Sequence, residues 1–241
     1  MTKWNKIFGK NCSYIKYKID EITAYSLYGM VYSFKFSIED FLKILKFISK
    51  NLNITKNSSL LDYGSGNGAL LGYFVNYFSL KNNISLEINK YFLTFQKKFI
   101  KFTNFHLGNS AKDLKKIKSN AVDYIMCNSV FQYFSSEKEV QDILEQFIRI
   151  CKKTILISFI LDEKKKNEYK EAVRKRQNLT RSEFKKKYKN TPIKFFSKSF
   201  FLKNQYLKKN AKSIKIINIP KNSLDSKFVY CCLIKKNNNY Q

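Results

Sequence analysis

The stretch LLDYGSGNGALLGYF, residues 60–74, places three of the chain's seven glycines within five positions. Glycine accepts positive φ and lets the backbone approach a ligand closely. Because apolar runs flank the cluster, the stretch predicts a buried strand, a ligand-binding turn and then a helix. In an open α/β sheet, such a turn lies at the carboxyl end of a strand, where ligands bind.

The sequence around this turn alternates between strand-like and helix-like segments. Apolar spacing at helical period predicts helices at 38–52, 67–78, 89–101 and 137–150, and a short one within 110–118. Ser37 and Ser136 precede two of these helices in the manner of N-caps. Short apolar runs predict strands at 59–64, 83–88, 104–109, 122–128, 154–160, 213–220 and 228–236.

This order of elements indicates the fold class. Strands that alternate with helices and are continuously apolar form parallel sheets covered on both faces. The last two strands have no full helix between them, so they are expected to form a hairpin at the sheet edge. We therefore predict an α/β protein with a doubly wound, seven-stranded, mostly parallel sheet and a C-terminal antiparallel hairpin.

The length of 241 residues is that of one domain with an appended subdomain. We divide it into an N-terminal helical region (1–55), a ligand-binding core (56–160), a basic helical insertion after the fifth strand (161–211), terminal strands (212–236) and a tail (237–241). The first 18 residues contain no apolar signal core, and the most apolar run, 155–161, is far shorter than the roughly 20 residues of a membrane span. We expect a cytoplasmic protein without a membrane span.

The net charge of +28 comes mainly from lysine, since only four of the 46 basic residues are arginine. Nucleic-acid binders favour the bidentate fork of arginine. The charge is also uneven, because residues 161–215 carry 19 Lys/Arg against 5 Asp/Glu. Most of the charge is interpreted as solvated background, with the basic insertion as the segment that could meet a partner.

Metal binding is not expected. The five cysteines contain no C-x-x-C pair, and the chain has a single histidine, His106. His106 lies between two apolar residues of the third predicted strand and is interpreted as structural.

The glycine turn itself is compatible with two nucleotide ligands. Gly64, Gly66 and Ala69 satisfy G-x-G-x-x-A, the dinucleotide-binding pattern, so NAD is one candidate. Asp62 and Gly68 extend the pattern to D-x-G-x-G-x-G. A carboxylate at that position opposes a pyrophosphate electrostatically, but it suits a ligand that presents an ammonium group.

From about residue 56 to 160, the sequence resembles the class I S-adenosylmethionine-dependent methyltransferases, whose first motif is an acidic residue followed by G-x-G-x-G. The resemblance implies a Rossmann-like fold and S-adenosylmethionine as cofactor. It also implies that Glu87 meets both ribose hydroxyls, since a carboxylate accepts two hydrogen bonds from a diol. The cofactor-binding residues implied are Asp62, Gly64, Gly66, Gly68, Glu87, Ile88, Asn109, Ser110 and Asn128, of which Asn109 and Ser110 would meet adenine.

Each of these residues also has a structural interpretation. Asp62 could cap the helix that begins near Asn67, and Glu87 could be a charge at the start of the next helix. Gln132 and Tyr133, after the fourth strand, are pocket candidates that could equally be packing residues. No catalytic base is assigned, because no residue stands out as one.

The methyl acceptor is less constrained. The segments NSVFQYF and PIKFFSKSFF are similar to stretches of methyltransferases of surface-polysaccharide or secondary metabolism. This favours a small-molecule acceptor or glycan building block, expected to be anionic, such as a phosphate- or nucleotide-linked sugar. The alternatives are an RNA or protein methyltransferase, and less so a dinucleotide-binding oxidoreductase.

The basic insertion is predicted to lie over the carboxyl edge of the sheet. Apolar pairs four residues apart indicate a helical lid over roughly 162–200. Arg174, Arg176 and Arg181 are substrate-binding candidates that would attract an anionic acceptor. The other interpretation is a solvated helix pair without a ligand.

Overall fold

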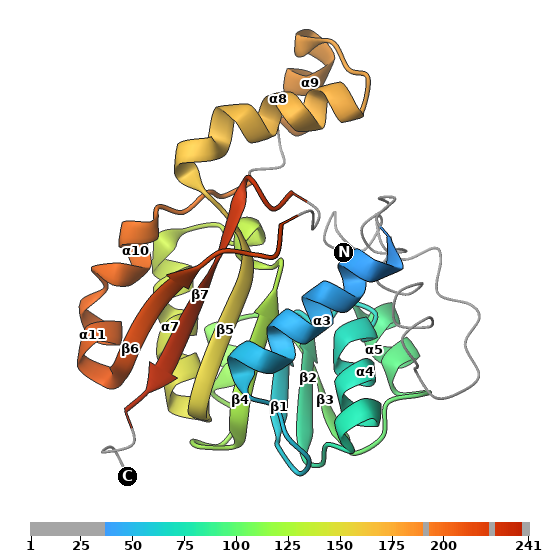
Figure 1. Ribbon diagram of the computed structural model, residues 1–241, viewed down its shortest axis with the longest axis vertical. Helices are drawn as coiled ribbons and strands as arrows, with labels where there is room; N and C mark the ends of the chain where they lie inside the picture. The colour runs from blue at the N-terminus through green and yellow to red at the C-terminus, as the bar shows by residue number, and fades with distance from the viewer. Residues whose placement is uncertain (1–36, 190–192, 222–224, 238–241) are drawn as a thin grey trace.

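The structure, a computed structural model, describes residues 37–189, 193–221 and 225–237. They contain a seven-stranded sheet with the order β3-β2-β1-β4-β5-β7-β6 (Figure 1). The strands are β1 (Leu60–Tyr63), β2 (Asn83–Glu87), β3 (Thr103–Leu107), β4 (Val122–Asn128), β5 (Cys151–Leu161), β6 (Ala211–Ile217) and β7 (Val229–Lys236).

The first five strands are parallel, and β7 pairs antiparallel with both β5 and β6. The predicted sheet and C-terminal hairpin are therefore confirmed. The chain runs outward from β1 to β3 on one side and from β4 to β5 on the other, so the strand order reverses between β1 and β4. The carboxyl ends at such a reversal are where ligands bind in open α/β sheets.

Helices cover both faces of the sheet. One apolar cluster joins the sheet to α3 (Ile38–Leu52), α4 (Ala69–Phe78) and α5 (Lys90–Gln96). The other joins it to α6 (Ala111–Leu114), α7 (Glu137–Ile150), α10 (Lys198–Leu202) and α11 (Gln205–Asn210). This doubly wound arrangement explains why β1, β2 and most of β5 are buried without alternation.

The two predicted serine caps are confirmed. Oγ of Ser37 accepts a hydrogen bond from the Asp40 amide over 3.1 Å at the start of α3. Oγ of Ser136 accepts from the Glu139 amide over 3.1 Å at the start of α7. Both bonds satisfy backbone donors that the first helical turn leaves without partners.

Some predicted boundaries were wrong. The helix expected over 89–101 ends at Gln96, after which the Lys98 amide bonds the carbonyl three residues back and Phe102 takes φ +53°. The helix expected from residue 67 begins at Ala69, because Gly68 in the left-handed region precedes it. The spacing of apolar residues alone does not predict these changes of backbone conformation.

The basic insertion has two parts. A 3-10 turn (Glu163–Lys165) leads into α8 (Lys166–Arg176) and α9 (Arg181–Tyr188), which lie beyond the carboxyl edge of the sheet, at the top of Figure 1. The chain then returns to the sheet, where α10 and α11 pack beside β6. Two helices, α8 and α9, lie in the segment expected to form a helical lid, 162–200, whereas α10 packs on the body of the fold.

The predicted N-terminal region 1–55 is described from residue 37 onward, and the predicted tail 237–241 lies outside the described residues except for Asn237. Within the described ranges, no helix combines the length and hydropathy of a membrane span.

Candidate active site

The glycine turn joins β1 to α4 at the carboxyl edge of the sheet. The Gly64 amide donates to the Leu86 carbonyl over 2.8 Å, which ties the turn to β2. Gly64, Gly66 and Gly68 take φ values of +71°, +58° and +83°, a region that residues with a side chain rarely adopt. A Cβ added at Gly66 would meet no atom within 4 Å, so the turn presents bare backbone to open space there.

Glu87 ends β2 and holds this turn. Its Oε2 accepts from the Gly66 amide over 2.7 Å, and its Oε1 accepts from the Asn89 amide over 2.8 Å. Glu87 is only 6% exposed, and burial raises the pKa of its carboxyl to about 7. Each carboxylate oxygen has two acceptor sites, so Glu87 retains acceptor capacity beyond the amides of Gly66, Asn89 and Ile88. The bond to Asn89 shows that Glu87 also serves the start of α5, as its structural interpretation proposed.

Asp62 lies two residues before the turn, in the buried part of β1. Burial, and secondarily the charge of Glu87, raise the pKa of the Asp62 carboxyl well above its usual value. Gly68 is the N-cap of helix α4, and no side chain caps this helix. The interpretation of Asp62 as the cap of that helix was therefore wrong, and a buried acid remains beneath the turn.

A buried polar cluster under the turn was not predicted from the sequence. Nε2 of Gln96 donates to the Gly66 carbonyl over 2.6 Å and to Oγ of Ser65 over 2.8 Å. Oγ of Ser85 donates to Oε1 of Gln96 over 2.7 Å, and Gln96 is fully buried. These bonds fix the turn from below. In the sequence, this cluster is indicated by Gln96, a polar residue on the otherwise apolar buried face of α5.

The residues that follow β3 form hydrogen bonds that stabilise the start of α6. Ser110 caps α6 in a reciprocal arrangement with Asp113, in which its hydroxyl donates to the Asp113 carboxylate over 2.7 Å. The Asn109 amide donates to the same carboxylate over 3.3 Å, and the Asn109 carbonyl accepts from the hydroxyl of Tyr63. These bonds position Asn109 and Ser110 at the same edge as Glu87, which ends the neighbouring strand.

The end of β4 supplies polar groups on the other side of the turn. Oδ1 of Asn128 accepts from Oγ of Ser158 over 2.7 Å, and Asn128 is buried. In the 3-10 turn that follows (Phe131–Tyr133), Nε2 of Gln132 donates to the Ser129 carbonyl over 2.7 Å. Oε1 of Gln132 is buried and has no hydrogen-bond partner among the described residues. Tyr133, beside it, is 43% exposed.

Two observations fit a ligand at the turn. The first is the open space that a Cβ at Gly66 would enter. The second is Nδ2 of Asn89, which is buried at the end of β2 and has no hydrogen-bond partner in the described part of the chain. A metal is not implied, because the described residues hold no cluster of three His, Cys, Asp or Glu side chains.

The three arginines predicted for the acceptor have different surroundings. Arg174 donates to both carboxylate oxygens of Glu171, over 3.0 and 2.6 Å, and to the Leu179 carbonyl. Arg176 pairs with Asp225 over 2.6 Å. Arg181 forms no ion pair with a described residue. Arg174 and Arg176 are thus committed to contacts within the chain, and Arg181 is the arginine available to a ligand.

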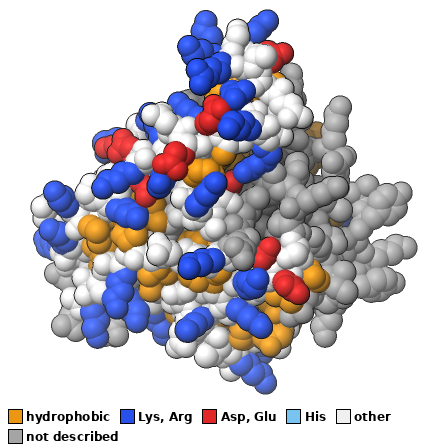
Figure 2. Space-filling model, turned by 45° about the horizontal axis from the view of Figure 1, so that its top comes forward, with side chains coloured by type: hydrophobic (Ala, Val, Ile, Leu, Met, Phe, Trp, Pro, Cys, Tyr) orange, Lys and Arg blue, Asp and Glu red, His pale blue; other side chains and the backbone are white. Residues whose placement is uncertain are grey.

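Charge alone does not locate a binding site on this edge. Figure 2 turns the top of the molecule toward the viewer and shows Lys and Arg side chains over the α8–α9 pair and elsewhere on the same face.

The parallel sheet, the glycine turn and the acidic end of β2 are the features that the resemblance to class I S-adenosylmethionine-dependent methyltransferases implies. The family model described as "Methyltransferase domain" matches residues 61–158, which span β1 to β5. This part of the chain is therefore similar to a methyltransferase domain, whose cofactor is S-adenosylmethionine. The match also favours S-adenosylmethionine over NAD as the ligand of the glycine turn.

Solved structures share the fold at low sequence identity. A S-adenosylmethionine-dependent methyltransferase from Archaeoglobus fulgidus is 15% identical with a TM-score of 0.58, over 88% of this chain and 99% of that one. Magnesium protoporphyrin IX methyltransferase from Synechocystis, with bound S-adenosylhomocysteine, is 11% identical with a TM-score of 0.57, over 90% and 95%. Geranyl diphosphate C-methyltransferase from Streptomyces coelicolor is 9% identical with a TM-score of 0.55, over 80% and 75%. No curated protein matches the sequence significantly.

Proposed function

We propose that this protein transfers a methyl group from S-adenosylmethionine to a small anionic acceptor in the cytoplasm, such as a phosphate- or nucleotide-linked sugar used for surface polysaccharides. The observation that carries the proposal is the position of α8 and α9. They lie beyond the same carboxyl edge of the sheet as the glycine turn, and every charged group in α9 except Glu183 is basic. A basic wall at this place suits an anionic acceptor.

The cofactor supplies an electrophilic methyl group, so the protein contributes mainly alignment and exclusion of water. Gly66 would let the backbone contact the cofactor, and the Glu87 carboxylate would accept from the ribose hydroxyls. Asn109 and Ser110 would border the adenine. Gln132 and Tyr133 would line the acceptor side, where the buried Oε1 of Gln132 can accept a hydrogen bond from the acceptor.

An acceptor that is already anionic or strongly nucleophilic does not need a general base. The buried acids near the turn, Asp62 and Glu87, are assigned here to the cofactor side. We therefore propose that the attacking atom belongs to a phosphate, carboxylate or amine of the acceptor, and we assign no catalytic base.

The experiment is methyl transfer from radiolabelled S-adenosylmethionine to a panel of acceptors. The panel contains nucleotide-linked sugars, sugar phosphates, the matching neutral sugars and total RNA. The proposal expects label in at least one anionic small molecule and none in its neutral counterpart. Label in RNA alone, or in the neutral sugars equally, contradicts it.

A further inference from the structure

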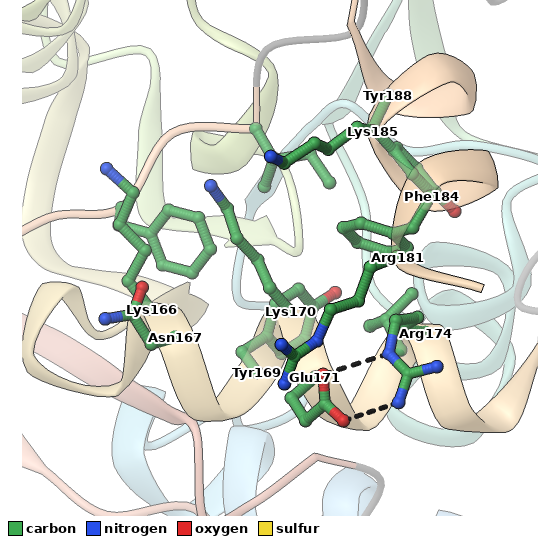
Figure 3. A pocket seen from close by; sticks show the side chains of 13 residues that line it. Lys166, Asn167, Tyr169, Lys170, Glu171, Arg174, Arg181, Phe184, Lys185 and Tyr188 are labelled. Atoms are coloured by element: carbon green, nitrogen blue, oxygen red, sulfur yellow. Dashed lines mark hydrogen bonds and ion pairs between the residues drawn. The ribbon is translucent and has the colours of Figure 1, made fainter. Parts of the chain in front are cut away.

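A pocket of about 520 Å³ lies between α8 and α9 (Figure 3). Residues on the inner sides of both helices line it, together with Ile193 and Phe195 from the segment that follows. This volume is within the range of small-molecule sites, roughly 300–1,000 Å³. The pocket is separate from the glycine turn, so it is not the cofactor site.

The pocket wall is largely aromatic. Tyr169 packs edge-to-face on Phe195, with ring centroids 5.7 Å apart, and Phe184 lies 4.6 Å from Tyr188. Rings on both sides of a cleft form a surface on which a flat ligand can stack. The structure holds these rings at the surface without burying any residue of α8 or α9 fully.

The polar side chains of the lining are mostly cationic. They are Lys166, Lys170, Arg174, Arg181 and Lys185, against a single acid, Glu171. Glu171 is already engaged in the bidentate pair with Arg174. Among the described residues, the remaining four cations form no ion pair, although Arg181 lies near enough to Glu171 to help Arg174 lower the pKa of its carboxyl.

These cations come from both helices toward one space. Figure 3 shows Lys170 extending from α8 and Lys185 from α9 toward the middle of the pocket, with Arg181 reaching across toward Glu171. Lys166 lies over the Phe195 ring, 5.8 Å from its centroid. Like charges that converge repel one another, and an anion between them removes that cost. Lysine and arginine also supply the charge-assisted donors that a phosphate accepts.

The pocket is linked to the methyltransferase edge by a direct backbone contact. The Lys194 amide donates to the Gln132 carbonyl over 3.0 Å. Lys194 lies between the two pocket residues Ile193 and Phe195, and Gln132 lies in the turn after β4. A ligand held in the pocket therefore sits beside the acceptor side of the proposed active site.

We propose that the α8–α9 pocket binds a flat ring that carries a phosphate-class acid group. The ring stacks among Tyr169, Phe184 and Phe195, and the acid group meets Lys170, Arg181 and Lys185. A nucleotide and an aryl phosphate share this chemistry. The role of the pocket as the acceptor's anchor rests on the proposed function, whereas binding of such an anion does not.

The test is calorimetry with the full chain at low salt. The probes are uridine diphosphate and 1-naphthyl phosphate, and the controls are uridine, 1-naphthol and inorganic phosphate. At least one probe is expected to bind at least roughly tenfold more tightly than both its neutral counterpart and inorganic phosphate. Tighter binding of uridine diphosphate identifies the ligand as a nucleotide, and tighter binding of 1-naphthyl phosphate identifies it as an aryl phosphate. Equal binding of the neutral compounds, or no binding by either probe, overturns the proposal.

Matched variants separate the pocket from general surface charge. Lys170→Gln with Lys185→Gln removes two lining cations, and Lys175→Gln with Lys186→Gln removes two cations from the same helices outside the lining. The first pair is expected to weaken binding of the preferred probe by roughly tenfold or more, and the second by less than about twofold. Equal losses in both pairs overturn the pocket assignment.

Binding and methyl transfer fail independently in this design. If the probes bind as expected but no anionic acceptor is methylated, the pocket stands and the proposed function fails. If an anionic acceptor is methylated and its KM does not change in the Lys170/Lys185 variant, the proposed function stands and the pocket is not the acceptor's anchor.

Discussion

The glycine turn and the α8–α9 pair lie at the same edge of the sheet, but different forces hold them. Under the turn, Gln96 is fully buried and bonds the Gly66 carbonyl, and the Glu87 carboxylate, only 6% exposed, accepts from the Gly66 amide. In α8 and α9 no residue is fully buried, and the helices are held by partly buried contacts, such as Tyr169 on Phe195 and Phe228, together with ion pairs such as Arg176 with Asp225. Substitutions at the turn should therefore change cofactor binding strongly, whereas those in α8 and α9 should change acceptor binding with small effects on the fold.

The largest effect is expected for Gly66→Val. The new side chain would enter open space where the cofactor is expected, so binding of S-adenosylhomocysteine should weaken by roughly a hundredfold or more. The backbone at φ +58° is strained for valine, at a cost of about 1–3 kcal/mol, so the protein should still fold. Calorimetry and a melting curve on the same sample measure both effects.

Gly68→Val is the matched comparison within the turn. A Cβ there would lie 2.7 Å from Cγ of Gln96 and from Cδ1 of Ile100, inside the packed core. This variant should lose thermal stability and cofactor binding together. If Gly66→Val melts as low as Gly68→Val, the turn has only a structural role, which contradicts the assignment.

The next effect is a pH dependence of cofactor affinity. The pKa of Glu87 is raised to about 7, mainly by burial, and donors from the ribose would favour its ionised form. Below pH 7 binding must first remove a proton, so the Kd for S-adenosylhomocysteine should rise by up to about tenfold per pH unit. Glu87→Gln should bind weakly with a flatter pH profile, and Asp62→Asn should retain the slope. A slope that survives in Glu87→Gln contradicts the role of this carboxyl.

Raising the pH through the pKa of Glu87 should favour cofactor binding but lower the stability of the free protein. The pKa of this carboxyl is higher when folded, about 7, than its ordinary value of 4.5. The folded state therefore binds the proton more tightly, and the stabilisation is complete below pH 4.5 and is lost as the pH rises through 7. The melting temperature should fall over this range in the wild type more than in Glu87→Gln.

A smaller effect is expected for Arg181→Gln. Arg181 lines the pocket and forms no ion pair among the described residues, so its loss should raise the acceptor's KM by roughly three- to tenfold and weaken its salt dependence. Affinity for S-adenosylmethionine should not change. Lys186→Gln, outside the lining, is the control of equal charge, and an equal rise in KM there contradicts a specific contact.

The smallest effect is expected for Arg176→Gln. Arg176 pairs with Asp225, with side-chain exposures of 33% and 13%. Such a pair contributes about 0.2–1 kcal/mol, so the melting temperature should fall by less than about 3 °C. Acceptor KM should stay within about twofold, because the guanidinium is already occupied. A larger rise in KM than for Arg181→Gln would reverse the assignment of the two arginines.

The same contrast explains which features the sequence predicted. The glycine turn follows from a local pattern, since positive φ selects glycine, and Glu87 was singled out because it ends the second predicted strand in the resemblance to methyltransferases. The cluster beneath the turn was missed, because Gln96 meets Ser85 and Ser65 only through tertiary packing. The ion pair of Arg176 was missed for a similar reason, because its partner Asp225 lies 49 residues away, whereas Glu171, the partner of Arg174, lies three residues away and was overlooked.

The most direct test of the cofactor site is calorimetry of S-adenosylhomocysteine with the wild type and Glu87→Ala, with NAD as a competing ligand. Micromolar binding is predicted for the wild type. Loss of a double acceptor for a buried diol should cost about 2–3 kcal/mol, which weakens Glu87→Ala by roughly thirty- to one-hundredfold. Unchanged affinity in Glu87→Ala would contradict the ribose assignment, and tighter binding of NAD than of S-adenosylhomocysteine would contradict the methyltransferase site itself.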